Sequence, residues 1–350
     1  MKIENRTPHQ DGFYMPGEFE PQDGVILIWP KRPGSWPYEA KEAGKVFAEI
    51  ANKLAETEKV YMLTEPETEA AARELLCENV EILTIPTDDA WARDVGPTFV
   101  TDGKEVRGVN WSFNAWGGTY DGLYQDWQKD DKVAEEFCKL TGYDYYDAAP
   151  FVLEGGSIES DGMGTLLTTS ECLLSPNRNG QLNKVEIEEY LRSTFHLERV
   201  LWLDYGYLAG DDTDSHIDTL ARFCSPDTIA YVQCRDVNDE HYEELHRMEE
   251  QLKTFRTLAG EPYRLLALPM ADKIEAEGER LPATYANFLI MNDAVLYPTY
   301  NQPENDMHAK EVLQMAFPKH EIVGVDCRAL IKQHGSLHCV TMQYPIGVIR

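Results

Sequence analysis

Cys339 has the setting most typical of a nucleophile in this sequence. It is one of seven cysteines and lies near the C-terminus, between a Gly/Ser/His-rich stretch and an apolar segment that predicts a strand (His334-Gly335-Ser336-Leu337-His338-Cys339-Val340-Thr341-Met342-Gln343). A cysteine attacks an electrophile as its thiolate, which needs a cationic neighbour or a cationic substrate. Most cysteines are simply small buried apolar residues, and we expect that of Cys77, Cys138, Cys172, Cys224, Cys234 and Cys327. A nucleophilic Cys339 therefore needs a base and substrate-holding groups from elsewhere in the chain.

Three earlier segments offer such groups at the predicted starts of strands: Trp91-Ala92-Arg93-Asp94-Val95-Gly96-Pro97, Leu153-Glu154-Gly155-Gly156 and Asp214-Ser215-His216-Ile217-Asp218. Each also has an ordinary explanation. Glu154 before two glycines is typical of a tight turn, and Asp94 of a surface salt bridge or an Asx turn. An isolated His-x-Asp is more often a structural hydrogen bond or a metal site, although no second histidine cluster supports a metal.

The spacing of His216 and Asp218 indicates which histidine would serve Cys339. Residues two apart in a strand point to the same side, so this imidazole and carboxylate would project together. His338 adjoins Cys339 and would point to the opposite face of a regular strand. We therefore predict that His216 is the partner of the cysteine.

One supersecondary unit recurs five times along the chain: apolar strand, polar loop, amphipathic helix, apolar strand. The predicted units span residues 24–63, 106–146, 164–203, 228–268 and 294–325, with helices over residues 38–56, 131–140, 184–194, 239–258 and 308–317. Short extra strands are predicted at residues 98–100, 156–159, 217–223, 285–291 and 337–342. The last of these follows the fifth unit, so it would have to pair with the first.

This order predicts an α/β fold: a five-fold pseudo-symmetric α/β propeller of ββαβ units around a central pore, with helices outside. A ring of units leaves few exposed strand edges and brings the starts of the inner strands together. Asp94, Glu154, His216, Asp218 and Cys339 lie at those starts. No linker or change in composition divides residues 1–350, which predicts a single domain. The alternative is an open doubly wound sheet, but the chain lacks both GxGxxG and a P-loop.

Composition restricts the possible partners. The net charge is −29, from 61 acidic and 32 basic residues, so nucleic acid and anionic membranes are poor partners and a cationic small molecule is favoured. The first explanation of this negative charge is that it keeps the protein soluble. The N-terminus has no apolar run typical of a signal peptide, and no stretch reaches the length of a membrane span. An odd number of cysteines without a CxxC pair fits a reducing cytoplasm and disfavours a structural zinc site.

The ordered set of motifs resembles the agmatine deiminase family, within the guanidine-modifying superfamily of five-bladed α/β propellers. Besides the segments above, the resemblance rests on Tyr14-Met15-Pro16-Gly17-Glu18-Phe19-Glu20-Pro21, Ile28-Trp29-Pro30 and Ser175-Pro176-Asn177-Arg178-Asn179, and it covers nearly the whole chain. It implies hydrolysis of agmatine to N-carbamoylputrescine and ammonia, without metal or cofactor. A homodimer is also implied by the resemblance alone.

The resemblance also implies roles for individual residues. Cys339 matches the nucleophile and His216 the general acid and base. Asp94 and Asp218 match the carboxylates that hold the guanidinium, and Glu154 matches the acid that supports substrate and histidine. Trp91 matches a tryptophan of the substrate channel, and Asp212 lies where relatives place an acidic residue near the distal amine. The implied reaction is attack by Cys339 on the guanidinium carbon, an amidino-thioether intermediate and its hydrolysis.

Two segments leave the details open. Many members of the family carry a glycine-rich run before the Leu/Ile-His-Cys motif, where this chain has Gln333-His334-Gly335-Ser336. The acidic and aromatic loop over residues 114–130 is either a lid or a surface excursion.

Three other functions compete with this interpretation. A deiminase acting on free or peptidyl arginine would need a positive group at the distal end, whereas Asp212 and the acidic field favour an amine. A non-catalytic propeller that binds a ligand would not need the whole Cys/His/Asp/Glu set. The third alternative is a metal-binding protein that uses the His-x-Asp motif.

Overall fold

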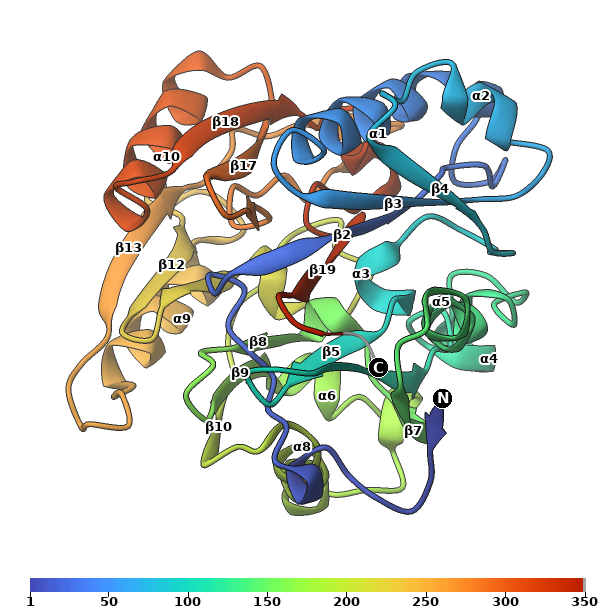
Figure 1. Cartoon of the computed structure of the whole chain (residues 1–350). Coiled ribbons are helices and arrows are strands. Elements are labelled where there is room, and N and C mark those ends of the chain that lie inside the picture. Colours follow the sequence, from blue (N-terminus) through green and yellow to red (C-terminus); the bar gives the residue numbers. More distant parts are fainter. Residues whose placement is uncertain (349–350) are drawn as a thin grey trace.

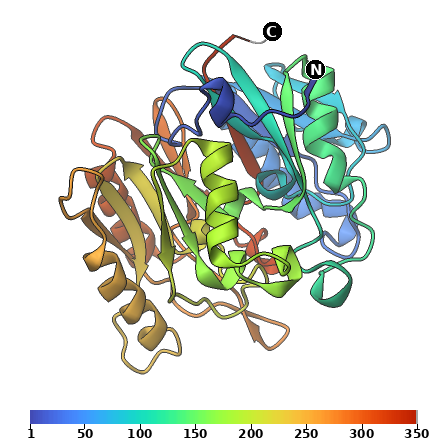
Figure 2. The same cartoon turned by 90° about the horizontal axis from the view of Figure 1, so that it is seen from below.

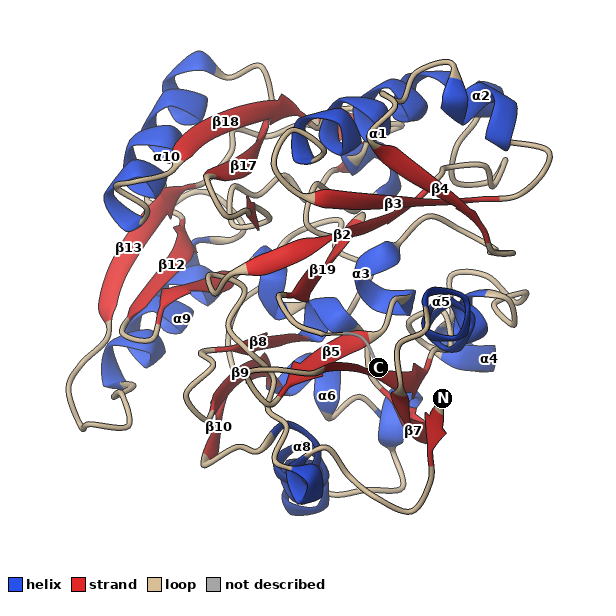
Figure 3. Cartoon of the chain, in the orientation of Figure 1, coloured by secondary structure: helices blue, strands red, loops and turns tan. Residues whose placement is uncertain are grey.

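The computed structural model describes residues 1–348, with the backbone alone at residue 39, and has a mixed α/β fold (Figures 1 and 3). Its strands form five separate sheets of three or four strands and one small hairpin, β14 (Glu275–Ala276) with β15 (Glu279–Arg280). No described sheet closes on itself. The five long helices lie on the outer side of the sheets (Figures 1 and 2), whereas the short helix α3 (Ala92–Val95) lies near the centre (Figure 1).

The first sheet joins the two ends of the sequence. Its order is β19-β2-β3-β4, with β2 at Gln22–Ile28, β3 at Lys59–Thr64, β4 at Val80–Thr84 and β19 at Thr341–Pro345. β2 and β3 are parallel, and β19 pairs antiparallel with β2, Thr341 lying opposite Leu27. The predicted pairing of the last strand with the first unit is thereby confirmed.

The second and third sheets follow in sequence. The second has the order β1-β7-β6-β5, with β1 at Lys2–Ile3, β5 at Thr98–Thr101, β6 at Val106–Ser112 and β7 at Tyr145–Val152. The third has the order β10-β9-β8, with β8 at Ile158–Ser160, β9 at Thr165–Thr169 and β10 at Arg199–Leu203. In both, an antiparallel strand pair is extended by a parallel neighbour.

The fourth and fifth sheets repeat this pattern. They have the orders β11-β12-β13 and β16-β17-β18. Their strands are β11 (Ala221–Ser225), β12 (Thr228–Gln233), β13 (Arg264–Pro269), β16 (Leu289–Ile290), β17 (Ala294–Thr299) and β18 (Glu321–Asp326). Each parallel pair is connected through a helix, as a parallel connection requires.

The long helices are α1 (Lys41–Leu54), α5 (Val133–Thr141), α8 (Lys184–Phe195), α9 (Tyr242–Thr254) and α10 (Pro303–Ala316). Shorter ones are α2 (Glu69–Arg73), α3 (Ala92–Val95), α4 (Gly118–Asp121), α6 (Ser170–Leu173) and α7 (Pro176–Asn179). The 3₁₀ turns are η1 (His9–Asp11), η2 (Tyr38–Ala40), η3 (Asp130–Lys132), η4 (Gly155–Ser157), η5 (Ile217–Thr219) and η6 (Ile331–Gln333). No helix among residues 1–348 is long and apolar enough to cross a bilayer.

Hydrophobic burial explains why these elements pack as they do. α1 buries Phe47, Ile50, Ala51 and Leu54, whose spacing places them on one helical face. The middle of β2 is buried residue after residue over Val25–Ile28, as expected of a strand covered on both faces. The sheets thus form an apolar frame from which the polar turns project inwards.

The short extra strands were the weakest part of the prediction. The segment at residues 217–223 begins as η5, and only Ala221–Ser225 is a strand. Residues 155–157 form η4 before β8, β16 covers only two residues, and β19 starts at Thr341 rather than at Leu337. The chain turns at these points because it enters the centre, where helical turns satisfy backbone groups that no neighbouring strand could reach.

Candidate active site

Four turns place the predicted site residues side by side. Asp94 lies in α3, Glu154 directly before η4, His216 and Asp218 at the start of and within η5, and Cys339 in the turn before β19. The structure brings all five together, but none lies on a strand. The strand-based argument for His216 and Asp218 was therefore wrong in its local geometry, since the 3₁₀ turn sets their directions.

Cys339 is half-buried, whereas every other cysteine is buried except Cys77, which is exposed. Its Sγ lies 3.4 Å from Asn287 Oδ1 and 4.0 Å from Asp218 Oδ2. Burial raises the pKa of the Cys339 thiol well above its ordinary value, and the negative charges of Asp218 and Asp94 raise it further. The resting cysteine is therefore a neutral thiol, and a cation between it and the carboxylates would favour the thiolate.

Asp94 is fixed by two donors. Its Oδ2 accepts a hydrogen bond from Trp116 Nε1 at 2.9 Å, and its Oδ1 accepts one from the Gly156 amide at 2.9 Å. Burial raises the pKa of the Asp94 carboxyl; His216 opposes this, whereas Asp218 and Glu154 add to it. A cation bound beside Asp94 would therefore gain from restoring its charge.

Asp218 has one occupied and one unpaired oxygen. Its Oδ2 lies 2.7 Å from His338 Nδ1, and its buried Oδ1 has no hydrogen-bond partner among the described residues. Burial alone would raise the pKa of Asp218, but His338 and then His216 outweigh it and hold that pKa below the ordinary value. A buried carboxylate oxygen without a donor is rare and indicates a site for a ligand that donates hydrogen bonds.

His216 is buried beside these carboxylates. Its Nδ1 lies 3.9 Å from Asp94 Oδ2, while its Nε2 has no hydrogen-bond partner in the described part of the chain. Burial acts to lower the pKa of His216, but Asp94, Cys172 and Glu154 together raise it well above the ordinary value. Gly156 permits this arrangement, because a Cβ there would lie 2.6 Å from His216 Nδ1.

Glu154 is fully buried and anchored by an arginine. Its Oε1 accepts a hydrogen bond from Arg178 Nε at 2.8 Å, and its Oε2 has no partner among residues 1–348. Arg178 also donates to Asp214 Oδ2 and to the Thr213 carbonyl. Arg178 belongs to one of the motifs that carried the resemblance, but its contact with Glu154 could not be read from the sequence.

A pocket opens beside Cys339. Of the four predicted binding residues, Trp91, Asp94 and Asp212 line it, together with His216 and Cys339. Asp218 and Glu154 are fully buried and are not among its lining residues. Further lining residues are Trp116, Leu123, Asp211, Thr213, Thr219, Gln333, His334 and Gly335. Trp116 and Leu123 come from the loop over residues 114–130, so that loop forms part of the pocket wall.

Asp212 lies in the pocket wall beside His334. Its Oδ2 lies 4.0 Å from His334 Nδ1, and 27% of its side chain is exposed. Partial burial raises the pKa of Asp212 to about 7; His334 opposes the shift and Asp211 adds to it. Two acidic side chains in this part of the wall would attract a positively charged group.

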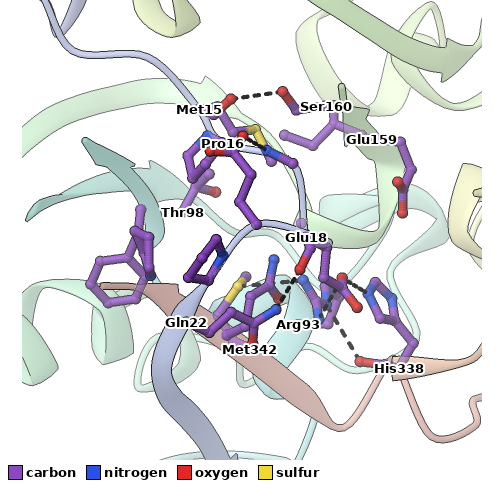
Figure 4. Close-up of a pocket in the computed structure, with 18 residues that line it drawn as sticks. Met15, Pro16, Glu18, Gln22, Arg93, Thr98, Glu159, Ser160, His338 and Met342 are labelled. Atoms are coloured by element: carbon purple, nitrogen blue, oxygen red, sulfur yellow. Dashed lines mark hydrogen bonds and ion pairs between the residues drawn. The ribbon is translucent and has the colours of Figure 1, made fainter. Parts of the chain in front are cut away.

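Behind the site, the His338 side chain reaches into a buried charge cluster with Glu18 and Arg93 (Figure 4). Its Nε2 lies 2.6 Å from Glu18 Oε2, which also accepts a hydrogen bond from Arg222 Nη2 at 2.8 Å. Arg222 in turn pairs with Glu159, and Arg93 lies 3.7 Å from the same Glu18 oxygen. A second pocket opens on this side. The cluster fixes the His338 ring through Glu18, and His338 in turn contacts Asp218. Residues remote from the pocket therefore orient the carboxylate next to Cys339.

Sequence reasoning missed Asn287 and the charge cluster. Asn287 Oδ1 accepts hydrogen bonds from the amides of His338 and Cys339, and its Nδ2 donates to the Asp218 carbonyl. One polar residue inside the apolar run Tyr285-Ala286-Asn287-Phe288-Leu289 was the available signal. Glu18 lies within the quoted Tyr14–Pro21 motif, but nothing local assigns it to Arg222, more than two hundred residues away.

Comparison with known proteins shows which fold and which protein family the chain resembles. The fold is shared with SxtG, an amidinotransferase from Microseira wollei, at a TM-score of 0.50 and 14% identity over 97% of this chain and 99% of that one. The family described as Porphyromonas-type peptidyl-arginine deiminase matches residues 14–345.

More similar proteins point to agmatine deiminases within this group. A Vibrio parahaemolyticus protein provisionally named as an agmatine deiminase is 42% identical over 99% of this chain and its own whole length. The agmatine deiminase of Enterococcus faecalis superposes with a TM-score of 0.94 at 37% identity, covering 99% of this chain and 100% of that one. A cysteine-to-serine variant of C. jejuni agmatine deiminase with substrate bound gives a TM-score of 0.88 at 35% identity, covering 96% and 97%. The chain belongs to the agmatine deiminase family.

Proposed function

We propose that this protein hydrolyses agmatine to N-carbamoylputrescine and ammonia. The observation that carries the proposal is the pocket in which Cys339 Sγ lies 4.0 Å from Asp218 Oδ2, with Asp94 and buried His216 on the same wall. A guanidinium is planar, positively charged and rich in N–H donors, so it complements two buried carboxylates, one with an unpaired oxygen. The similarity to agmatine deiminases over nearly the whole chain supports the choice of substrate.

The proposed reaction begins when the guanidinium enters between Asp94 and Asp218. Its charge lowers the pKa of the Cys339 thiol, which loses its proton to solvent and attacks the guanidinium carbon. His216, protonated at rest, gives its proton to the departing nitrogen as the C–N bond breaks, and ammonia leaves. An amidino group remains bonded to Cys339 Sγ.

Hydrolysis completes the cycle. Water attacks the carbon of the amidino-thioether and passes a proton to the now neutral His216. The C–S bond then breaks and the new hydroxyl group gives up its proton to the departing sulfur, which releases the neutral ureido product and returns Cys339 as thiol. Cys339 supplies the nucleophile and His216 the acid and the base, while solvent takes the proton that the thiol loses when the substrate binds. Glu154 lies close to His216.

The five sheets, the outer helices and the β19–β2 pairing support our proposal that residues 1–350 form one five-bladed α/β propeller domain. The site residues then come from different blades around the central axis. Location in the cytoplasm and assembly as a homodimer stay predictions.

The activity is tested by ammonia release from agmatine and from arginine under the same conditions. We expect kcat/KM for agmatine to exceed that for arginine by at least ~10²-fold, because the α-carboxylate of arginine would lie against Asp211 and Asp212 and like charges cost several kcal/mol. Equal or faster turnover of arginine would assign the protein to arginine instead. Peptidyl arginine provides a third substrate in the same assay.

Asp212→Asn should weaken agmatine binding in a pH-dependent way. The pKa of Asp212 is about 7, so the carboxylate is ionised above pH 7 and neutral below it. Wild-type kcat/KM should therefore fall about tenfold per pH unit as the pH drops below 7, because the free enzyme then lacks the charge that binds the distal ammonium. At pH 8 the variant should have a KM about 10–100-fold higher than that of the wild type. The fall of kcat/KM below pH 7, the acid limb of the profile, should be absent from the variant. Steady-state kinetics from pH 5.5 to 9 check it, with exposed Asp293→Asn as control. If Asp212→Asn keeps the same acid limb, a group other than Asp212 is responsible for that limb.

Gly335→Ala should narrow the mouth of the pocket. A Cβ at Gly335 would lie 2.1 Å from Trp91 Cζ3, so the indole must move. We expect KM for agmatine to rise about tenfold with a smaller change in kcat, since a displaced side chain beside the substrate loses mainly binding. Gly34→Ala is the matched control, because an added Cβ there meets nothing within 4 Å. An unaltered KM would show that Trp91 does not contact the substrate.

A further inference from the structure

A buried group of potential metal ligands lies directly behind the acid–base histidine. Glu154, Cys172 and His216 each offer one ligand atom, and these three atoms lie within 4.8 Å of one another. Cys172 comes from α6 and has no role in the proposed reaction. All three residues are at least nine-tenths buried.

The unsatisfied atoms in this group point to a ligand. His216 Nε2 and Glu154 Oε2 are both buried without a hydrogen-bond partner among residues 1–348. Their other polar atoms are engaged, since Glu154 Oε1 binds Arg178 and His216 Nδ1 faces Asp94. A buried ring nitrogen and a buried carboxylate oxygen that both lack a hydrogen-bond partner are a costly arrangement unless something binds there.

We propose that Cys172 Sγ, His216 Nε2 and Glu154 Oε2 form a binding site for Zn²⁺ that sequesters the histidine. Imidazole, thiolate and carboxylate are the three ligand types that zinc takes in proteins, and three protein ligands leave a fourth position for water.

The dimensions fit with small adjustments. Three atoms within 4.8 Å of one another have a common point no more than about 2.8 Å from each (4.8 divided by √3). Zinc needs about 2.0–2.3 Å to these atoms, so each ligand moves by about half an ångström or a little more. Side-chain torsions of Glu154 and Cys172 can supply such a shift.

Charge also balances when zinc binds. The free group holds an imidazolium, a neutral thiol and a carboxylate. Zinc displaces the thiol proton and the Nε2 proton to solvent, which leaves neutral imidazole, thiolate and carboxylate around a doubly charged ion, so the net charge is unchanged. The surroundings are acidic overall, because Asp94 faces the ring and Arg178 is paired with both Glu154 and Asp214.

The other group of potential ligands in the described chain, Glu18, Glu159 and His338, does not share these features. Arg222 pairs with both glutamates, and His338 Nε2 is bonded to Glu18. A cationic side chain already fills the role that a metal would take there.

Binding is tested first in a chain that lacks the two accessible thiols, Cys77→Ser/Cys339→Ser. With Co²⁺ as the probe, we expect one ion per chain, a thiolate-to-cobalt charge-transfer band in the near ultraviolet, and displacement by Zn²⁺. Adding Cys172→Ala should abolish the band and raise the dissociation constant at least ~10²-fold. Adding Cys224→Ser, at another buried cysteine, should leave both unchanged.

Several outcomes would overturn the site: no binding, binding without a thiolate band, or a band that persists in Cys172→Ala. Should the Cys172 variants fail to fold, X-ray absorption at the zinc edge of the Cys77→Ser/Cys339→Ser protein decides. One sulfur at about 2.3 Å supports the site, and a shell of nitrogen and oxygen alone contradicts it.

The consequence for activity rests on the proposed function, whereas the binding test does not. Zinc on Nε2 would remove the acid and base, so Zn²⁺ should lower kcat of the Cys77→Ser enzyme and a chelator should restore it. Relative to its own metal-free rate, Cys172→Ala should need at least ~10-fold more Zn²⁺ for half inhibition. Equal sensitivity would place inhibition at Cys339 instead.

Discussion

Cys339→Ser should lower kcat for agmatine by about 10⁴-fold or more while leaving substrate binding almost intact. A serine hydroxyl ionises far less readily than a thiol even beside a cation, so the attacking anion is lost. The groups proposed to hold the guanidinium, Asp94 and Asp218, are untouched, and the replacement changes one atom in a half-buried position. Ammonia release measures the loss of turnover, and isothermal titration with agmatine should give a dissociation constant close to the wild-type KM.

The covalent step can be observed separately by comparing the wild-type enzyme with Cys339→Ser. Acid-quenched wild-type enzyme should carry, on the peptide containing Cys339, the mass of agmatine less ammonia; the serine variant should not. Cys77→Ser controls for the other accessible thiol and should keep full activity and the adduct. Activity within tenfold of wild type in Cys339→Ser, or an adduct on another cysteine, would reject Cys339 as the nucleophile.

The repeating unit was predictable because its signals are local. α8 is the clearest example: Asn183 and Glu186 form a reciprocal capping box at its start, and the observed helix Lys184–Phe195 ends one residue beyond the predicted end. α9 was predicted too long, because Phe255 already has extended backbone and the chain turns at Thr257–Gly260. Hydrophobic periodicity reports burial well and helix ends poorly.

The inner turns were misjudged for a physical reason. Ile217, Leu220, Ala221 and Phe223 are all fully buried, so the segment has the apolar content of a strand. Its first residues, Ile217–Thr219, nonetheless form a 3₁₀ turn, closed by the bond from the Thr219 amide to the His216 carbonyl, and the strand begins only at Ala221. Burial at the centre of the molecule, rather than strand pairing, selected the apolar residue Ile217.

The residues that support the site depend on contacts between distant segments. Asn287, Glu18 and Arg222 show no local pattern of function, and each acquires one only through partners from other sheets. The prediction placed His338 on the opposite face of a regular strand, but residues 337–340 form a turn before β19. The His338 ring lies against Glu18 and Asp218, while Cys339 lines the pocket. The adjacent histidine thus contributes through Asp218, and the proposed acid–base role falls to the more distant His216.

His216→Asn should lower kcat by about 10³–10⁴-fold with little change in KM, because general acid and base catalysis contribute in both halves of the proposed reaction. The variant keeps both carboxylates and the thiol, so guanidinium binding should survive. His241→Asn is the matched control: His241 is also buried and lies 2.6 Å from a carboxylate, that of Asp239, but outside the pocket.

The pH profile separates a catalytic loss from a packing defect in this variant. His216 has a raised pKa, so its acid form persists through neutral pH and disappears as the pH rises through that value. Wild-type kcat/KM should therefore decline on the alkaline side, and the residual activity of His216→Asn should lack that limb. A packing defect would scale the whole profile down and keep its shape. Retention of the alkaline decline in His216→Asn would mean that another group sets it, and that His216 positions the substrate rather than transferring protons.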